Sequence, residues 1–357
     1  MKCDIRPNLR LVQQVARIER FCGAWERLSQ STAIASNQLE VHALQWGSIS
    51  ALALDSSTPP SLALMLAKLF GEEGAGTAFY SDSLAENTSL PTGLDDPALE
   101  QYIRAHALEF QISSQGVHQL YSRVTGAGVV DFDAADAFDQ ATTCFRKGTV
   151  QFLSPSMEAI FPTVPAFLIE QRLFDLLEWT SAELERGVIH PLFVIGTFYL
   201  LFLQVHPYPT ANHRLAQLMA WNLLEENEFA FVRFAHFSPV LLARRKQYFN
   251  ALRQAEKTAF GNWSTLNIWL DFFLDTLIET TENLWQSCRR DEQLARLSGI
   301  QRQIIEVIKE HGSVTRERIA TETGINLSTV KYNLSVLSER GHLRRQGGGR
   351  TTSYTVL

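Results

Sequence analysis

Hydrophobic residues recur at helical spacing along most of the chain, and this pattern predicts a mainly α-helical protein. Residues 31–55 are rich in alanine, and other helices are expected at about 97–123, 164–185, 191–204, 212–226, 239–255 and 263–290. In the predicted helix over 8–30, the apolar face consists of Leu9, Val12, Val15, Ile18 and Phe21. Residues 56–98 are rich in Ser, Thr, Gly and Pro around one helical patch at 60–70, which is typical of a loop or insertion.

A short extended segment interrupts the helices. The stretch from Arg146 to Leu153 reads as a strand, a turn follows at Ser154 and Pro155, and a second strand leads to Pro162. The pattern therefore predicts a β-hairpin flap over about 148–162.

The last sixty residues form a separate α+β pattern. Three helical stretches with caps at Thr315 and Ser328 and a turn at Gly324 precede two short strands around a run of glycines. This order resembles a winged helix-turn-helix. We therefore expect an N-terminal helical region over 1–95, a helical core over 96–290 and a winged domain over 291–357.

Charge differs between these parts of the chain. From Ser298 onward, nine Lys and Arg residues and five acidic residues give a net charge of +4. Because the whole chain has a net charge of −6, residues 1–297 have a net charge of −10. A basic module on an acidic body favours DNA as its partner. Contacts with base edges and phosphates are expected from Ser328, Thr329, Lys331, Tyr332, Asn333, Arg344, Arg345 and Arg350. Protein contacts or homodimerisation are the alternative use of such a domain.

Composition excludes several classes. The longest apolar run, 191–205, is shorter than a membrane span, so no membrane partner is expected. The N-terminus lacks the apolar core of a signal peptide. Four scattered cysteines have neither CxxC spacing nor ligand spacing, which favours a reduced, cytoplasmic location.

The segment from His206 to Gln217 carries the main candidate chemistry. A histidine ends an apolar helix, a polar loop follows, and Asn212 and Arg214 open the next helix, with Asn212 as its expected cap. The free N–H groups of a helix start suit a phosphate, an arginine adds a forked cation, and histidine accepts a proton near neutral pH. The alternative is a histidine at the edge of the core beside a capped helix.

The same segment resembles the motif of the Fic family, H-x-F-x-(D/E)-G-N-G-R-x-x-R. The resemblance extends over about residues 31–275 and includes Phe161-Pro162, His190-Pro191, the Tyr248-Phe249 pair, and Trp263 to Phe273. It implies a Fic-type helical domain with a flap. Most members transfer AMP from ATP to a hydroxyl of a target protein, so ATP is the implied donor, a protein hydroxyl the implied acceptor, and the flap would align the target.

The resemblance also assigns residues. His206 would be the general base, Tyr208 would anchor the loop, and the implied nucleotide-binding residues are Ala211, Asn212, His213, Arg214, Tyr248 and Phe249. Thr210 stands at the acidic position that holds Mg2+, so the motif offers no metal ligand there and does not support Mg2+ binding. His213 and Gln217 replace a glycine and the second arginine, and Ala211 replaces the other glycine.

Ser36 to Glu40 resembles the family's inhibitory motif, (S/T)xxxE(G/N), although Val41 departs from it. The glutamate would normally pair with the second arginine, which here is Gln217. A Glu–Gln hydrogen bond is weaker than that ion pair. A vestigial inhibitory helix is therefore expected, and a plain helix with a surface glutamate is the alternative.

Three functions remain open. The first is transfer of AMP, or of a related nucleotide-derived group, to a protein hydroxyl. The second is a catalytically impaired Fic fold that regulates transcription through its DNA-binding module. The third, removal of AMP by water, is the least favoured, since it usually needs the metal that Thr210 does not support.

Overall fold

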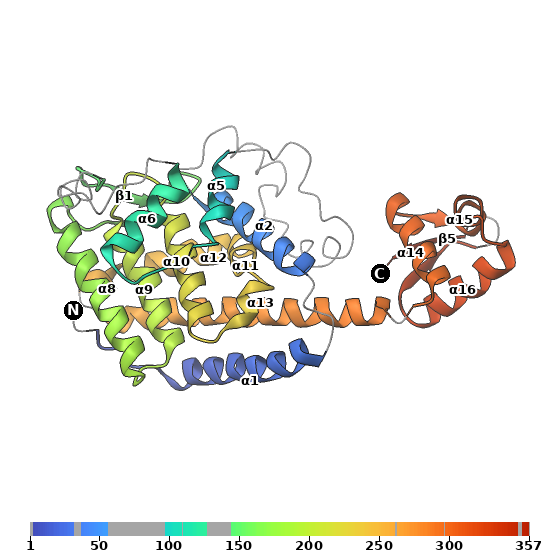
Figure 1. The fold of residues 1–357 in the computed structure, drawn as a ribbon, viewed down its shortest axis with the longest axis horizontal. Helices are drawn as coiled ribbons and strands as arrows, with labels where there is room; N and C mark the ends of the chain where they lie inside the picture. Colours follow the sequence, from blue (N-terminus) through green and yellow to red (C-terminus); the bar gives the residue numbers. More distant parts are fainter. Residues whose placement is uncertain are drawn as a thin grey trace. The chain divides into compact units, whose positions relative to one another are not determined.

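A computed structural model of the chain describes residues 3–31, 37–55, 97–108, 110–126, 144–260, 263–295, 297–348 and 352–356. These residues form two compact units, Met1–Ser287 and Cys288–Leu357 (Figure 1). The expected helical patch at 60–70, Ser36 of the inhibitory motif and Arg350 of the wing lie outside the described residues.

The described part of the first unit is mostly helical, as the pattern predicted. Its α-helices are α1 (Leu9–Ser31), α2 (Asn37–Leu54), α5 (Pro97–Ala105), α6 (Ser114–Thr125), α8 (Ile169–Arg186), α9 (Pro191–Val205), α10 (Asn212–Glu226), α11 (Ser238–Ala243), α12 (Arg245–Gln254) and most of α13 (Leu266–Ala295), whose residues from Cys288 onward belong to the second unit. Short 3-10 helices are η1 (Ala166–Leu168), η2 (Ala230–Arg233), η3 (Glu256–Phe260) and η4 (Trp263–Thr265).

Helix α9 lies at the centre of this unit, packed against α8 and α10. Every residue from Leu192 to Val205 is buried, because the segment is apolar on all sides. Pro191 opens the helix and the His190 side chain accepts a bond from the Leu192 N–H. Gly196 lets α13 approach, since a Cβ at this position would lie 2.8 Å from Leu270 and Phe273. The Trp269 indole N–H donates to the Gly196 carbonyl at 2.6 Å.

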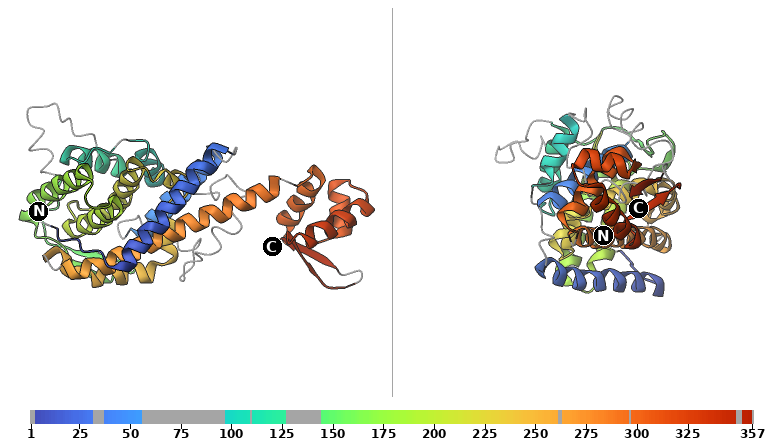
Figure 2. Two further views of the ribbon diagram at one scale, coloured as in Figure 1. Left: turned by 90° about the horizontal axis from the view of Figure 1, so that it is seen from below. Right: turned by 90° about the vertical axis from the view of Figure 1, so that its right-hand side faces the viewer.

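Helix α1 lies along α13 (Figure 2), and its buried face differs from the expected one. Val15 and Ile18 of the expected face are buried, but Leu9 and Val12 are exposed, and Leu11, which was not expected there, is fully buried. The buried stripe is shifted because Gln14, a polar residue, belongs to it: its amide donates to Asp271 and Asp275 of α13.

Two expected helices are broken in the structure. The stretch 97–123 contains α5 and α6, because Ser113 caps a new helix by accepting a bond from the Gly116 N–H. The stretch 239–255 contains α11 and α12, divided at Arg244. The flap prediction is confirmed: β1 (Gln151–Leu153) pairs antiparallel with β2 (Ala159–Pro162), with Phe152 opposite Phe161.

The second unit contains the predicted winged helix-turn-helix. It comprises α14 (Gly299–His311), β3 (Val314–Thr315), α15 (Arg316–Thr323), α16 (Leu327–Glu339), β4 (Leu343–Gln346) and β5 (Ser353–Val356), with sheet order β3-β5-β4. Thr315 caps α15 and Gly324 turns at φ 68°, as expected. The expected cap at Ser328 is wrong: Asn326 caps α16, and its side chain accepts from the Ser328 N–H.

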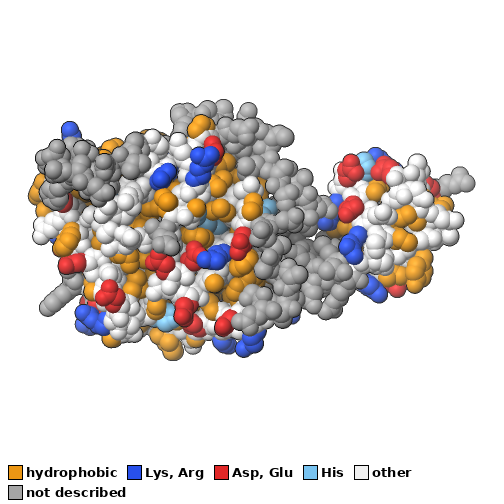
Figure 3. Space-filling model, in the orientation of Figure 1, with side chains coloured by type: hydrophobic (Ala, Val, Ile, Leu, Met, Phe, Trp, Pro, Cys, Tyr) orange, Lys and Arg blue, Asp and Glu red, His pale blue; other side chains and the backbone are white. Residues whose placement is uncertain are grey.

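Among the described residues, no helix combines the length and the apolar character needed to cross a membrane. Figure 3 shows charged side chains of both signs spread over the drawn face of the first unit.

Candidate functional site

The loop between α9 and α10 begins and ends at residues whose backbone φ and ψ angles lie in the left-handed helical region. His206 ends α9 at φ 49° and ψ 61°, and Ala211 precedes α10 at φ 62° and ψ 8°. A non-glycine residue in this region costs about 1–2 kcal/mol, so the surrounding contacts must hold both turns. The loop is therefore fixed by its packing and does not follow from local preference.

Asn212 supplies part of that packing. Its Oδ1 accepts from the Tyr208 N–H at 2.9 Å and its Nδ2 donates to the Tyr208 carbonyl at 2.7 Å. Its side chain thus closes the loop on itself and does not cap α10 as expected, since Ala211 is the N-cap.

Tyr208 holds the same loop against the core of the unit. Its ring is fully buried and stacks on Tyr121 at 3.9 Å, and its hydroxyl lies 2.7 Å from His118 Nδ1. Burial lowers the pKa of His118 to about 4, so this ring is neutral at pH 7.

His206 is half-buried at the end of α9. Its Nδ1 is buried and has no partner in hydrogen-bond geometry among the described residues. Burial, with a smaller effect from the nearby Arg146 cation, lowers the pKa of His206 to about 4. Phe152 of the flap packs edge-on to this ring at 5.7 Å, so β1 covers a neutral imidazole.

His213 and the aromatic pair lie in the core. His213 Nε2 is 2.6 Å from the Tyr248 hydroxyl, which is in turn 2.8 Å from that of Tyr199. Tyr248 is fully buried, and Phe249 is 8% exposed. Burial lowers the pKa of His213 to about 4. His213 and Tyr248 are therefore joined by a buried hydrogen bond in this structure.

Arg214 forms a buried ion pair that the sequence did not indicate. Its Nε donates to Asp55 Oδ2 at 2.7 Å, and both side chains are almost fully buried. Tyr102 also binds this turn, donating from its hydroxyl to the Arg214 carbonyl at 3.0 Å. Asp55 directly follows α2. The sequence pattern that could have indicated this ion pair was a single acidic residue at the end of an apolar helix.

The remaining residues that the sequence placed at the site, Gln217, Glu40 and Thr210, lie on α10, on α2 and in the loop between α9 and α10. Gln217 Oε1 accepts from the Ser238 hydroxyl, and its Nε2 is buried with no hydrogen-bond partner in the part of the chain that the structure describes. Glu40 is half-buried on α2, and no hydrogen bond joins it to Gln217 within the described residues. Thr210 is exposed. Across the described part of the chain, no three His, Cys, Asp or Glu side chains gather as a metal site.

Most of the expected DNA-contacting side chains are exposed. Ser328, Lys331, Arg344 and Arg345 are exposed, Tyr332 is 69% exposed, and Thr329 is half-buried. Asn333 was wrongly expected to face outward. It is buried, and its Nδ2 donates to the Thr329 carbonyl one turn earlier.

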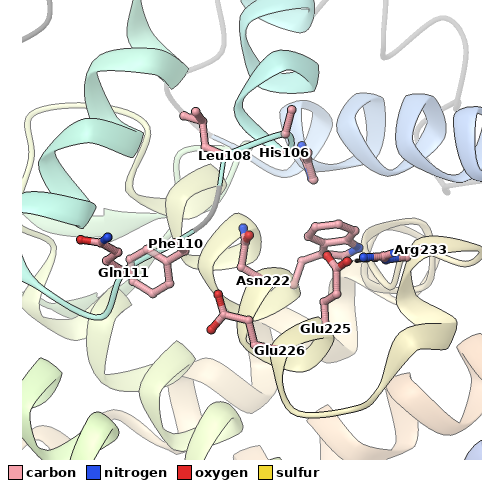
Figure 4. A pocket seen from close by; sticks show the side chains of 10 residues that line it. His106, Leu108, Phe110, Gln111, Asn222, Glu225, Glu226 and Arg233 are labelled. Carbon is pink, nitrogen blue, oxygen red and sulfur yellow. Dashed lines mark hydrogen bonds and ion pairs between the residues drawn. The ribbon is translucent and has the colours of Figure 1, made fainter.

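A cavity of about 630 Å³ lies beside the C-terminal half of α10, between that helix, η2 and the α5–α6 connection (Figure 4). It contains none of the predicted site residues. His106, on its wall, lies 3.3 Å from His236 through their Nε2 atoms. Because His236 Nδ1 accepts from the Ser238 N–H, His236 must donate from Nε2, and His106 donates from Nδ1 to the Tyr102 carbonyl.

Comparison with known proteins identifies the C-terminal unit first. Residues 297–343 match the family model described as winged helix-turn-helix DNA-binding. A curated protein of Aquifex aeolicus (strain VF5), named as a probable protein adenylyltransferase, is 23% identical over 188 residues, covering 52% of this chain and 53% of that protein. The chain thus matches about half the length of this relative.

One solved structure supports the fold, and a second is less similar. A Fic family protein from Desulfovibrio desulfuricans G20 superposes over 100% of this chain and 98% of its own, with a TM-score of 0.54 and 17% identity. A Fic domain containing signaling protein from Bacteroides thetaiotaomicron VPI-5482 covers 78% of this chain and 97% of its own, at 12% identity and a TM-score of 0.46. The chain therefore has the fold of a Fic family protein and carries a winged helix-turn-helix domain at its C-terminal end.

Proposed function

We propose that the chain is a Fic-type transferase that moves AMP, or a related nucleotide-derived group, from a nucleotide donor to a hydroxyl of a protein. The observation that carries this proposal is His206, a neutral imidazole held in a left-handed turn at the end of α9. A neutral imidazole has an unshared electron pair that can accept a proton at pH 7, and the loop after His206 leads into the N-terminal end of α10, where anions are stabilised.

In the proposed reaction His206 accepts the proton of the target hydroxyl, whose oxygen attacks the α-phosphorus of the donor. The new P–O bond joins AMP to the target, and with ATP the leaving group is pyrophosphate. Binding of the target beside β1 is favoured, because Phe152 on that strand already contacts the His206 ring.

The residues around His206 fit a nucleotide only in part. The start of α10 and the Arg214 guanidinium suit a phosphate. In this structure, however, the Arg214 guanidinium donates a hydrogen bond to Asp55. Donor phosphates must therefore share Arg214 with a carboxylate. Thr210 offers a hydroxyl where a hard cation needs a carboxylate, so we assign no step to Mg2+.

A panel of donors tests this function. The purified chain, alone and with a cell extract, is incubated with labelled ATP, CTP, GTP, UTP or CDP-choline. The mass added to the labelled protein identifies the transferred group, and the expected result is a covalent, acid-stable adduct from one donor. Absence of transfer from all five donors would contradict the proposal.

The second candidate is a DNA-binding regulator that uses the Fic fold without catalysis. Exposed Lys331, Tyr332, Arg344 and Arg345 on the winged unit support it, together with the match of residues 297–343 to a DNA-binding family model. This candidate predicts salt-sensitive binding to particular DNA sequences, checked by titration against the DNA upstream of the chain's own gene. Equal affinity for unrelated DNA would count against it.

A further inference from the structure

Arg146 is a buried cation between the flap and the end of α9. It is 5% exposed, and in the described part of the chain no carboxylate pairs with it. A guanidinium removed from water needs acceptors for its donors. Within the described residues, four backbone carbonyls accept hydrogen bonds from the Arg146 guanidinium.

The carbonyls come from two separate parts of the chain. From α9 and its end, the guanidinium binds His206 O through Nε at 2.6 Å and Val205 O through Nη2 at 3.2 Å. From the flap, it binds Gly148 O, before β1, at 2.5 Å, and Val164 O, after β2. The Arg146 main-chain N–H also donates to the Pro207 carbonyl at 3.0 Å.

We infer that Arg146 is the positioning residue that fixes the backbone at His206 and ties it to both ends of the β1–β2 flap. The carbonyls at the end of α9 form the negative end of that helix, where a cation is favoured. One planar side chain that binds both segments sets the distance between them, so the flap and the His206 ring keep one relative position. His206 can then hold its left-handed conformation without a glycine.

The same cation acts on the His206 ring. A positive charge beside an imidazole disfavours a second positive charge, and Arg146 contributes after burial to the lowered pKa of His206. Arg146 therefore has two separable effects, one of geometry and one of charge. Neither depends on a nucleotide or on the proposed transfer reaction.

Two substitutions separate these effects. Arg146→Gln removes the charge and most of the donors, whereas Arg146→Lys keeps the charge but cannot bridge four carbonyls. The pKa of His206 is measured by NMR titration of the histidine-labelled full chain, with His206→Gln used to assign the signal. Amide hydrogen exchange is measured at Val164, whose N–H donates to Gln204 O at 3.0 Å. Lys147→Gln, an exposed neighbouring site, is the matched control for loss of one charge.

The expected results differ between the variants. In Arg146→Gln the pKa of His206 rises, because the neighbouring positive charge is lost, and exchange at Val164 quickens by roughly tenfold or more. In Arg146→Lys exchange quickens while the pKa stays near its original value, and Lys147→Gln changes neither. Unchanged exchange at Val164 in Arg146→Lys would overturn the inference, even if Arg146→Gln failed to fold. A failure of nucleotide transfer would leave both readouts intact.

Discussion

At the residue scale, the polar side chains of Asn212, His213 and Arg214 that follow His206 all bind other groups of the protein. Asn212 binds Tyr208, His213 binds Tyr248 and Arg214 binds Asp55. The sequence singles out this loop as the candidate site, since residue type and spacing carry a motif. Side-chain partners depend on residues far away in the chain, so Asp55 could not be paired with Arg214 from the sequence.

Thr210→Asp tests whether the loop has lost a metal site. Thr210 is exposed, so a carboxylate there needs no repacking, and it would give a hard cation a charged oxygen ligand. We expect calorimetry to find tighter ATP binding with Mg2+ than without it in this variant. Thr210→Asn, neutral and of similar size to aspartate, is the control and should not gain the Mg2+ dependence. Equal ATP affinities of the variant in both conditions would contradict this expectation.

At the element scale, the buried pair joins the end of α2 to the start of α10. Because α2 also packs on α11, the contact links the N-terminal helices to the motif helix. The inhibitory interpretation predicted a contact from α2 through Glu40. The structure instead has an acid after the other end of that helix, 15 residues later.

Asp55→Asn should be strongly destabilising, because it leaves Arg214 buried without a counter-charge. The expected loss is about 3–5 kcal/mol of the free energy of unfolding, measured by urea denaturation. Asp55→Asn combined with Arg214→Met removes both charges and should recover part of this loss. If the double variant is no more stable than Asp55→Asn, the unpaired charge of Arg214 is not the cause of the lost stability.

Acid should destabilise the first unit through its buried histidines. Burial lowers the pKa of His106, His118 and His213 from 6.5 to about 4, so they stay neutral when folded while the unfolded chain takes up protons. Stability is therefore complete above pH 6.5 and falls toward pH 4, by about 1.4 kcal/mol per pH unit for each ring. Thermal melts from pH 7 to 5 measure this. His106→Gln should weaken the slope, and a melting temperature constant over this range would contradict the account.

Helix order and the flap were predictable because their periodicity is local. The division of 97–123 and of 239–255 was not, since each break follows from a cap or turn that competes with continued helical periodicity. The buried face of α1 was misplaced for a related reason. Gln14 belongs to that face only because α13 presents Asp271 and Asp275 to it.

At the scale of the whole molecule, a Fic-type unit and a winged unit share one chain. The charge difference between them was visible in the sequence, and the exposed basic residues of the winged unit agree with it. Asn333 was misassigned because helical position alone did not reveal its bond to the Thr329 carbonyl.

DNA binding by the winged unit should be electrostatic in large part. Lys331→Gln removes one exposed cation of α16 and should lower the slope of log affinity against log salt by about one. Fluorescence anisotropy at several salt concentrations measures this slope. Arg302→Gln, exposed on α14, is the control for net charge. An equal loss of slope in both variants would argue against a specific role for α16.

We propose His206 as the base of a group-transfer reaction. The most direct measurement is the rate of label transfer from the best donor at pH 7, compared between the unmodified chain, His206→Ala and a control, His311→Ala, in the other unit. The account predicts a loss of at least about 100-fold for His206→Ala and an unchanged rate for the control. Transfer at the original rate by His206→Ala would contradict it.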